Sequence, residues 1–459
     1  MTVETIGIVP SVPVVAKGST PIPAKGSSGE QTPYTTLTRY RIFQDEHQKT
    51  WWEKTGPLLG KILASAGYSL ARQFEAMTFY VEVLLPLLGP YPHHFRSAIT
   101  RSGLPLEFSV NYQQLGNIEP VVRIGFEPVA APSGRSEDPF NQEPIGCLLD
   151  CLKQLHLPGF DDALFRHFLE TQTVNAAEKA QLALNSKSDG GGQKIAMEGS
   201  ALTSQAAFGF DLKKETIAVK GYTFPALKCH ASGQGFGQLL TNSIQPLKDQ
   251  MGAFPSFDMV NAYLEETNGY SQFAFWSFDC VDSYTSRLKL YSSHNEVVWS
   301  KIEEIWTLGG RAQSPNLGTG LRYLKELWQL VKLSEGHRAF TGGFDDGKDS
   351  TPTPMVWNYE MKVGEPAPVT KFYFPIHGES DLDVVQGVAQ FLTKIGLEKY
   401  GTDYEQTVRE YFPERDLNTT ARLTSWISFA YTEKTGVYLS IYYHSSADYP
   451  WLEEESSQK

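Results

Sequence analysis

Apolar and polar positions follow two patterns along this chain, and the change from one to the other repeats five times. Stretches with helical periodicity precede pairs of short runs with the period of two that is typical of strands. The predicted strand pairs are 104–112 with 120–131, 206–212 with 216–225, 272–281 with 286–292, 354–361 with 371–377, and 422–431 with 437–444. The predicted helices are 45–66, 70–88, 143–155, 161–169, 175–184, 237–251, 256–266, 297–306, 318–333, 382–395 and 403–411.

Strands that follow each other so closely form antiparallel hairpins. This excludes the parallel barrel in which a helix separates consecutive strands. Five hairpins of one pattern predict an α+β fold, a closed ten-stranded antiparallel barrel with helices outside. A barrel of that size encloses a lumen wide enough for ligands.

The two ends of the chain lack these patterns. Residues 1–33 are rich in Pro, Gly, Ser and Thr, and Pro10 and Pro13 break their one apolar patch. No basic segment precedes that patch, so we expect a disordered tail rather than a signal peptide. We expect 34–452 to form a single barrel domain and 453–459 to be a frayed end.

Several predicted strands place cations and aromatic rings on one face, because side chains two residues apart share a face. The opposite face carries residues such as Val219 and Leu288, which suit packing under helices. The polar face should therefore line the lumen. It comprises Arg123, Lys220, Tyr222, Phe224, Arg287, Lys289, Tyr291, Lys371, Tyr373, Tyr438, Ser440 and Tyr442.

This face has two interpretations. A Lys-x-Tyr pattern on one strand is ordinarily a solvated surface. Its recurrence on several strands favours a site in which cations bind a diphosphate and tyrosine rings stabilise a carbocation. Those two requirements together match an allylic diphosphate that ionises.

Glu107 interrupts an otherwise apolar predicted strand. A buried carboxyl group is rare without a partner. It is either a structural hydrogen-bond acceptor or a base for an N–H proton, and the residue pattern leaves both open.

Composition narrows the classes of function. The chain has 459 residues and a net charge of −12, so we expect no nucleic-acid partner. No apolar run approaches the roughly 20 residues of a membrane span, so we expect no membrane partner. Four cysteines are too few for a disulfide scaffold, which favours a reduced, cytoplasmic compartment. We expect Cys147 and Cys151 to pack in the core rather than bind metal.

The run Asp345-Asp346-Gly347-Lys348-Asp349 spells the magnesium motif of many prenyl-diphosphate enzymes. Glycines before it and Ser-Thr-Pro after it predict a loop. We therefore expect no metal site, and a Mg²⁺-dependent enzyme that uses Asp345, Asp346 and Asp349 is the competing interpretation.

Six short stretches form a distinctive set: 51–57 (WWEKTGP), 88–92 (LGPYP), 123–128 (RIGFEP), 138–141 (DPFN), 306–311 (WTLGGR) and 428–431 (SFAY). Together they resemble the fungal aromatic prenyltransferases of the dimethylallyltryptophan synthase family. The resemblance covers about 40–451. It implies a barrel of five ααββ units and transfer of dimethylallyl to an indole, with no metal or other cofactor.

The resemblance also implies a role for each candidate residue. Glu107 matches the glutamate that accepts the indole N–H proton. Trp426 stands where several members have a shield tyrosine, and Thr432, with Lys434 nearby, where some have an arginine that contacts diphosphate. Diphosphate-binding cations match at Arg123, Lys220, Arg287, Lys289 and Lys371, shield tyrosines at Tyr222, Tyr291, Tyr373 and Tyr442, and the acceptor pocket at Ile99, Thr100, Ala207, Phe224, Ala274 and Trp426.

Two departures from the family concern the acceptor. Members that act on free tryptophan have a lysine at the position of Ala207 and an arginine at that of Ala274. Free tryptophan thus loses the clamp for its carboxylate, whereas a cyclic dipeptide needs none. The stretches 207–211 (AFGFD), 342–345 (GGFD) and 357–360 (WNYE) resemble reverse prenyltransferases of tryptophan-containing cyclic dipeptides, of the notoamide and brevianamide type.

The expected function is transfer of dimethylallyl from dimethylallyl diphosphate to the indole of a tryptophan-containing cyclic dipeptide. We expect reverse attachment at C2, in fungal indole alkaloid biosynthesis. The alternatives are normal attachment, attachment at C3, C4 or C7 of another indole or a tyrosine, and a non-catalytic barrel that binds a hydrophobic anion. The expected partners are the two small-molecule substrates, with a homodimer left open.

Overall fold

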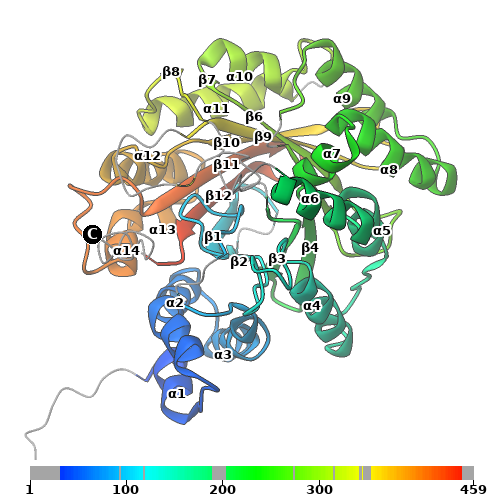
Figure 1. Cartoon of the computed structure of the whole chain (residues 1–459). Helices are drawn as coiled ribbons and strands as arrows, with labels where there is room; N and C mark the ends of the chain where they lie inside the picture. The colour runs from blue at the N-terminus through cyan, green and yellow to red at the C-terminus, as the bar shows by residue number, and fades with distance from the viewer. Residues whose placement is uncertain are drawn as a thin grey trace, which may run out of the picture.

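Ten strands close into an antiparallel barrel in the computed structural model, which describes residues 31–91, 95–116, 119–188, 203–271, 274–313, 316–340, 344 and 353–446. The strand order around the barrel is β1-β12-β11-β10-β9-β6-β5-β4-β3-β2. This confirms the predicted fold (Figure 1). The strands are β1 Leu106–Gln113, β2 Val121–Phe126, β3 Ala206–Leu212, β4 Ile217–Thr223, β5 Phe275–Asp279, β6 Leu288–His294, β9 Met355–Met361, β10 Val369–Phe374, β11 Thr424–Thr432 and β12 Gly436–His444.

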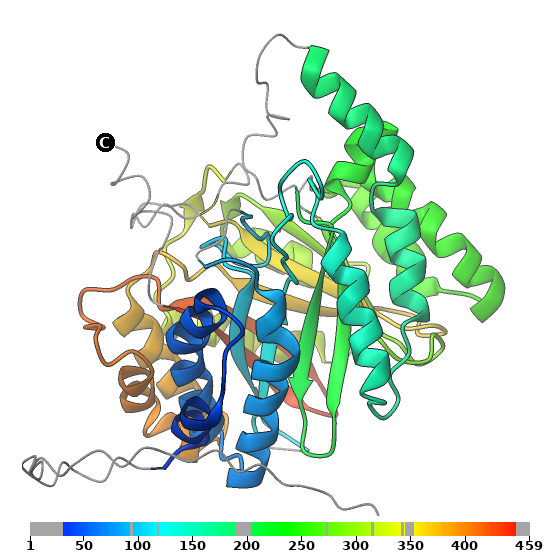
Figure 2. The same ribbon diagram turned by 60° about the horizontal axis from the view of Figure 1, so that its bottom comes forward.

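Helices surround the barrel, as Figures 1 and 2 show. Each pair of neighbouring strands in the chain is preceded by helices, which matches the predicted repeat. The helices are α1 Pro33–Tyr40, α2 Glu46–Ser65, α3 Leu70–Phe79, α4 Glu143–Gln154, α5 Ala163–Gln172, α6 Ala176–Ser188, α7 Ala226–Ser232, α8 Phe236–Met251, α9 Pro255–Glu266, α10 Trp299–Trp306, α11 Leu317–Leu330, α12 Asp381–Lys394, α13 Glu398–Gly401 and α14 Tyr404–Tyr411.

The structure differs from the sequence prediction in a few elements. The expected helix 70–88 changes to a π turn at Tyr80–Leu84 and a 3₁₀ turn at Leu85–Leu87, where Pro86 cannot continue the helical hydrogen bonds. The helices α1, α7 and α13 and the short strands β7 (Glu296–Val297) and β8 (Gly336–His337) were not predicted.

The ends of the chain lie mostly outside the described residues. The expected tail 1–33 is described only from residue 31, and there α1 already begins at Pro33, capped by the Thr32 hydroxyl. The expected frayed end, 453–459, lies outside the described residues.

The outward faces of the strands form the core with the helices. Phe165 of α5 stacks on Phe208 of β3, with ring centroids 4.6 Å apart. Gly221 of β4 lies beneath these rings, and a Cβ atom there would stand 2.3 Å from Phe278 and 2.6 Å from Phe165. The outer face is therefore closely packed and apolar, which leaves the inner face for polar side chains.

The prediction that Cys147 and Cys151 pack in the core was wrong. Cys147 is exposed and Cys151 is half-buried, because α4 turns other residues inward: Ile145, Leu148, Leu149 and Leu152. Their spacing is that of one helix face. All four cysteines are free thiols, and in the described part of the chain no helix is long and apolar enough to cross a membrane.

Candidate active site

A cavity of about 270 Å³ occupies the barrel lumen, and residues from all ten strands line it. Alternate strands of an antiparallel barrel run in the same direction. On three of them, β4, β6 and β10, the lumen-facing sequence reads cation and then tyrosine, as in Lys220-x-Tyr222. The cations therefore gather toward one end of the lumen and the tyrosines form the next layer.

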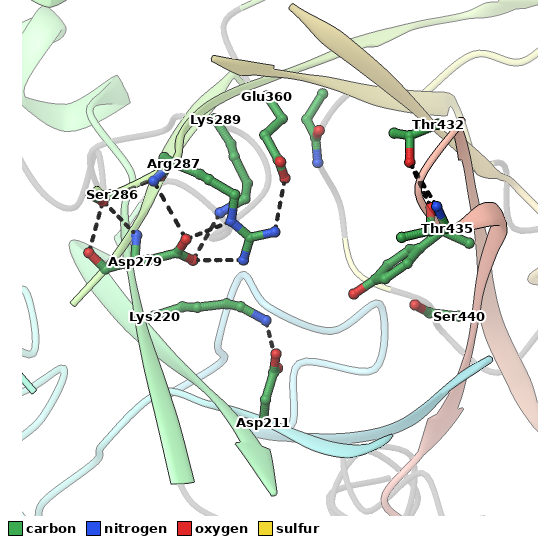
Figure 3. A network of polar contacts seen from close by, with 12 residues as sticks. Asp211, Lys220, Asp279, Ser286, Arg287, Lys289, Glu360, Thr432, Thr435 and Ser440 are labelled. Atoms are coloured by element: carbon green, nitrogen blue, oxygen red, sulfur yellow. Dashed lines mark hydrogen bonds and ion pairs between the residues drawn. The ribbon is translucent and has the colours of Figure 1, made fainter. Parts of the chain in front are cut away.

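The end of the lumen with the cations, here called the charged end, is an ion-pair network (Figure 3). Asp211 accepts a hydrogen bond from Lys220 Nζ at 2.5 Å and forms an ion pair with Arg123, whose Nε lies 3.0 Å from Asp211 Oδ1. Asp279 accepts from Arg287 Nε at 2.6 Å and from Lys289 Nζ at 3.1 Å. The Arg287 guanidinium also reaches a third carboxylate, Glu360, at 3.3 Å.

The charges at this end do not balance. Lys371 joins the four paired cations, so five cations face three carboxylates and the excess is positive. Burial opposes ionisation of Asp211, yet Arg123 and Lys220 hold its pKa well below its usual range. Burial together with neighbouring cations lowers the pKa of Lys371. A bound polyanion would relieve that crowding, since it supplies the missing negative charge.

Four tyrosines form a continuous collar above the charged end. Successive ring centroids are 6.3 Å apart for Tyr222 and Tyr291, 5.8 Å for Tyr291 and Tyr373, and 6.1 Å for Tyr373 and Tyr442. Burial raises the pKa of each of the four phenols. They are therefore neutral, and their ring faces offer negative electrostatic potential to a cation in the lumen.

Glu107 lies on the other side of the collar, toward the apolar end of the lumen. Its carboxylate accepts a hydrogen bond from Ser425 Oγ at 2.6 Å. Ser425 reaches it because the register of β11 against β12 shifts between Thr424 and Trp426. Burial raises the pKa of Glu107 to about 8, and the bond from Ser425 only partly opposes that shift.

Five of the six expected acceptor-pocket residues line the cavity at this apolar end: Ile99, Thr100, Phe224, Ala274 and Trp426. Ala207 is not a lining residue. It is buried in β3 opposite Tyr222, and the cavity touches its neighbours Phe208 and Gly209 instead. The expected diphosphate cations and shield tyrosines all line the cavity.

Thr432 stands at the position of the family arginine, and its hydroxyl is hydrogen-bonded to the hydroxyl of Thr435 at 2.8 Å (Figure 3). Tyr438 instead lies at the charged end. Its hydroxyl accepts a hydrogen bond from Arg123, and its ring centroid lies 4.4 Å from Lys371 Nζ. The alternation of residues in β12 had already predicted that Tyr438 faces the lumen. It did not predict the contacts of Tyr438 with Arg123 and Lys371.

Sequence reasoning missed two groups of lining residues. Asp211 and Glu360 share the lumen-facing phase of their strands, so alternation could have found them. Arg101 belongs to the loop before β1, where no periodicity points to the lumen. The cavity lining thus includes a cation outside the strands, although Ala207 and Ala274 stand where the family members that act on free tryptophan have a lysine and an arginine.

The competing magnesium motif, Asp345 to Asp349, lies outside the described residues. Within the described ranges, no group of three or more His, Cys, Asp or Glu side chains is arranged to hold a metal ion.

Known proteins have similar sequences and a similar architecture. The sequence profile described as tryptophan dimethylallyltransferase matches residues 47–407. Prenyltransferase phqI of Penicillium fellutanum is 65% identical over 94% of this chain and 96% of its own length. Reverse prenyltransferase criA of Aspergillus cristatus is 42% identical over 92% of this chain and 96% of its own.

A solved structure agrees over the same extent. The crystal structure of NotF in complex with brevianamide F and DMSPP has a TM-score of 0.80 and 40% identity, and covers 91% of this chain and 100% of that chain. The resemblance drawn from the sequence motifs is thereby confirmed. The chain belongs to the tryptophan dimethylallyltransferase family.

Proposed function

We propose that this protein transfers the dimethylallyl group of dimethylallyl diphosphate to the indole of a tryptophan-containing cyclic dipeptide, in reverse orientation at C2. The observation that carries the proposal is the polarity of the lumen. Excess cations lie at one end, neutral tyrosine rings in the middle, and a buried carboxyl group beside an apolar pocket at the other end. Each layer matches one part of the reaction.

The charged end would bind the diphosphate. Lys220, Lys289 and Lys371 donate to its oxygens as point charges, and Arg123 and Arg287 donate with planar guanidinium groups. These contacts stabilise the negative charge that develops as the C–O bond breaks. The dimethylallyl cation then lies in the tyrosine collar, which shields it from water.

The apolar end would hold the indole against the open face of that cation. As the new C–C bond forms between indole C2 and the tertiary carbon of the dimethylallyl group, the N1 proton becomes acidic and Glu107 accepts it. Loss of the C2 proton and return of the N1 proton restore the aromatic ring. The net products are the prenylated dipeptide, diphosphate and one proton.

The relatives support the acceptor class and the orientation. NotF was solved with brevianamide F, and criA is described as a reverse prenyltransferase. We place the reaction in the cytoplasm, which four free thiols support. The homodimer stays a prediction, which light scattering of the purified chain checks.

The lumen favours a cyclic dipeptide over free tryptophan for a reason of charge. Free tryptophan brings an ammonium group, and the lining carboxylates in the described residues are Glu107, Asp211 and Glu360. Asp211 and Glu360 are paired at the charged end, and Glu107 faces the indole. A cyclic dipeptide carries neither the ammonium nor the carboxylate of free tryptophan, so it avoids the cost of desolvating them.

The test is a comparison of kcat/KM for cyclo-Trp-Pro, cyclo-Trp-Ala and free tryptophan with dimethylallyl diphosphate. We expect at least about a hundredfold preference for the cyclic dipeptides, because an uncompensated buried charge costs several kcal/mol and each 1.4 kcal/mol is tenfold. Equal efficiency on free tryptophan would contradict the acceptor class, and absence of any prenylated product would contradict the function.

A further inference from the structure

A register shift in β11 brings Ser425 to the inner side of the barrel. Thr424 pairs with Tyr443 and Trp426 pairs with Tyr442, so Ser425 is the extra residue of a β-bulge. In a regular strand Ser425 would face away from Trp426, because neighbouring side chains alternate. Since Trp426 lines the cavity, the Ser425 hydroxyl would point toward the outer helices without the bulge.

The Ser425 hydroxyl reaches Glu107 across a whole strand. Strand β12 lies between β1 and β11, yet Ser425 Oγ donates to Glu107 Oε1 at 2.6 Å. Ser425 is fully buried and does not line the cavity, so it contacts the carboxylate but not a ligand. Within the described ranges it is the one side-chain donor to Glu107. The second oxygen, Oε2, therefore remains for a ligand in the cavity that Glu107 lines.

A buried carboxylate fixes the segment that leads into the bulge. Asp381 stands at the start of α12, and its Oδ2 accepts from the backbone N–H groups of Arg422 at 2.9 Å and Leu423 at 3.1 Å. Its Oδ1 accepts from the Thr424 N–H at 3.2 Å and from the Thr424 hydroxyl at 2.9 Å. These bonds hold the residues directly before Ser425, so the serine is in place before any ligand binds.

A hydroxyl group in this position has two consequences for a base. It fixes one oxygen of the carboxylate, which determines the direction in which the other oxygen points. It also stabilises the ionised form, because the hydrogen bond from Ser425 lowers the pKa of Glu107 against the larger effect of burial. A serine with a purely structural role would satisfy a buried group and do neither.

Other ionisable groups lie on the elements packed against Glu107. They are His444 and Tyr442 of β12, His377 after β10, Arg123 of β2 and Arg101 of the loop before β1. His444 stands directly opposite Glu107 on β12, and its Nε2 lies 3.0 Å from His377 Nδ1. Substitution of Ser425 changes none of these groups, so a change in the pH dependence would come from the lost hydroxyl.

We propose that Ser425 is a positioning residue for the base, and that its hydroxyl holds Glu107 Oε1 so that Oε2 faces the indole N–H. The inference rests on the proposed function, in which Glu107 accepts the N1 proton. Ser425 acts only through Glu107, and binding of dimethylallyl diphosphate does not depend on it.

The test measures kcat/KM for cyclo-Trp-Pro against pH in the wild type, S425A and S425C, at saturating dimethylallyl diphosphate. We expect S425A to move the midpoint of the profile upward by about one pH unit and to lower kcat/KM at pH 7 about 10- to 100-fold, the effect of one lost hydrogen bond to a charged group. S425C should fall between, because a thiol is a weaker donor. KM for dimethylallyl diphosphate should stay within about twofold. An unchanged midpoint in S425A would overturn the proposal.

A double variant separates positioning from a structural role. Glu107→Gln combined with S425A should turn over within about twofold of Glu107→Gln alone, because Ser425 acts through the carboxylate. A further loss in the double variant would overturn the proposal. S243A is the matched control, since Ser243 is a buried serine of α8 whose hydroxyl donates to the Leu239 carbonyl at 2.8 Å. It should keep the wild-type midpoint, and a shift equal to that of S425A would overturn the proposal.

Two measurements keep the outcomes separate. If S425A fails to fold, judged by thermal unfolding, S425C decides: an unchanged midpoint overturns the proposal. If the wild type prenylates no cyclic dipeptide, the proposed function fails. The pKa of Glu107, followed by the carboxyl infrared band that Glu107→Gln removes, then tests Ser425 alone. A higher pKa in S425A supports its role, and equal values in S425A and the wild type overturn it.

Discussion

Glu107 combines two properties that a proton acceptor for an indole needs. It lies in an apolar part of the lumen, and its one described side-chain hydrogen bond comes from Ser425. A carboxyl group with a pKa near 8 is a stronger base than an exposed glutamate once it is ionised. In the proposed reaction, Glu107 takes a proton that becomes acidic only as the allyl cation adds to the ring.

Glu107→Gln should lower kcat by roughly 10²- to 10⁴-fold, since it removes the base and leaves the shape of the site. The amide oxygen can still accept from Ser425, so the fold should be unchanged. The Kd for dimethylallyl diphosphate should also change little, because that ligand contacts the other end of the lumen. Steady-state kinetics and a diphosphate titration check both parts, and wild-type turnover in the variant would make Glu107 structural.

The pKa of Glu107 also predicts a pH dependence. The base is the carboxylate, so the active fraction rises with pH and is complete only above a pKa of about 8. At saturating dimethylallyl diphosphate, kcat/KM for the acceptor should rise about tenfold per pH unit below pH 8 and then level off. The negative charge of bound diphosphate should keep the lysines protonated, so we expect no separate step from them.

Glu107→Gln provides the control for that profile and should be flat over the same range. A wild-type profile that is already flat from pH 6 would show that an ionised group with an ordinary pKa does the work.

At the scale of the elements, strand direction determines where the cations and the tyrosines gather along the barrel axis. Strands β4, β6 and β10 run the same way and each presents a cation before a tyrosine. The carboxylates that hold these cations come from neighbouring strands, such as Asp279 at the end of β5. The charged end is thus assembled across strands, and no single hairpin contains it.

Asp279→Asn tests this assembly. Loss of the charge leaves Arg287 and Lys289 in a buried cluster with a larger positive excess, so the free energy of unfolding should fall by about 3 kcal/mol. Burial opposes ionisation of Asp279, but Lys289, Arg287 and Lys220 lower its pKa. Its contribution is therefore present at neutral pH and lost as the pH falls below the ordinary range of aspartate.

Urea unfolding checks the size of that change, and saturating pyrophosphate should stabilise the variant more than the wild type. Asp258→Asn is the control, because its ion pair with Lys248 is solvent-exposed and should contribute less than about 1 kcal/mol. A loss below 1 kcal/mol for Asp279→Asn would contradict the role of the network.

The strands were predictable because their period of two is repeated in five hairpins, and the lumen-facing phase followed from it. The geometry between neighbouring strands could not be predicted from the sequence. The β11 shift that brings Ser425 to Glu107 has no signal in one strand. Arg101 belongs to a loop, whose path depends on contacts with distant residues such as Ser204. The prediction for Cys147 failed because a helix with many apolar residues still buries only one face, and Cys147 lies on another.

At the scale of the whole molecule, the barrel separates charge from apolar surface along its axis. In the proposed function, the excess cations at one end neutralise the diphosphate with side chains alone. Turnover should therefore survive excess EDTA. Assays with EDTA, and with Asp345→Ala and Asp346→Ala combined, check this. A loss of activity that Mg²⁺ restores only when both aspartates are present would favour the metal-dependent alternative.

The most direct test of the account is the structure of the product. Purified protein would be incubated with dimethylallyl diphosphate and cyclo-Trp-Pro, and the product solved by NMR. The account predicts loss of the indole C2 proton, four intact protons on the benzene ring, and a dimethylallyl group bonded through its tertiary carbon, with vinyl signals. A product substituted elsewhere on the indole, or bonded through the primary carbon, would contradict it, as would recovery of unmodified dipeptide.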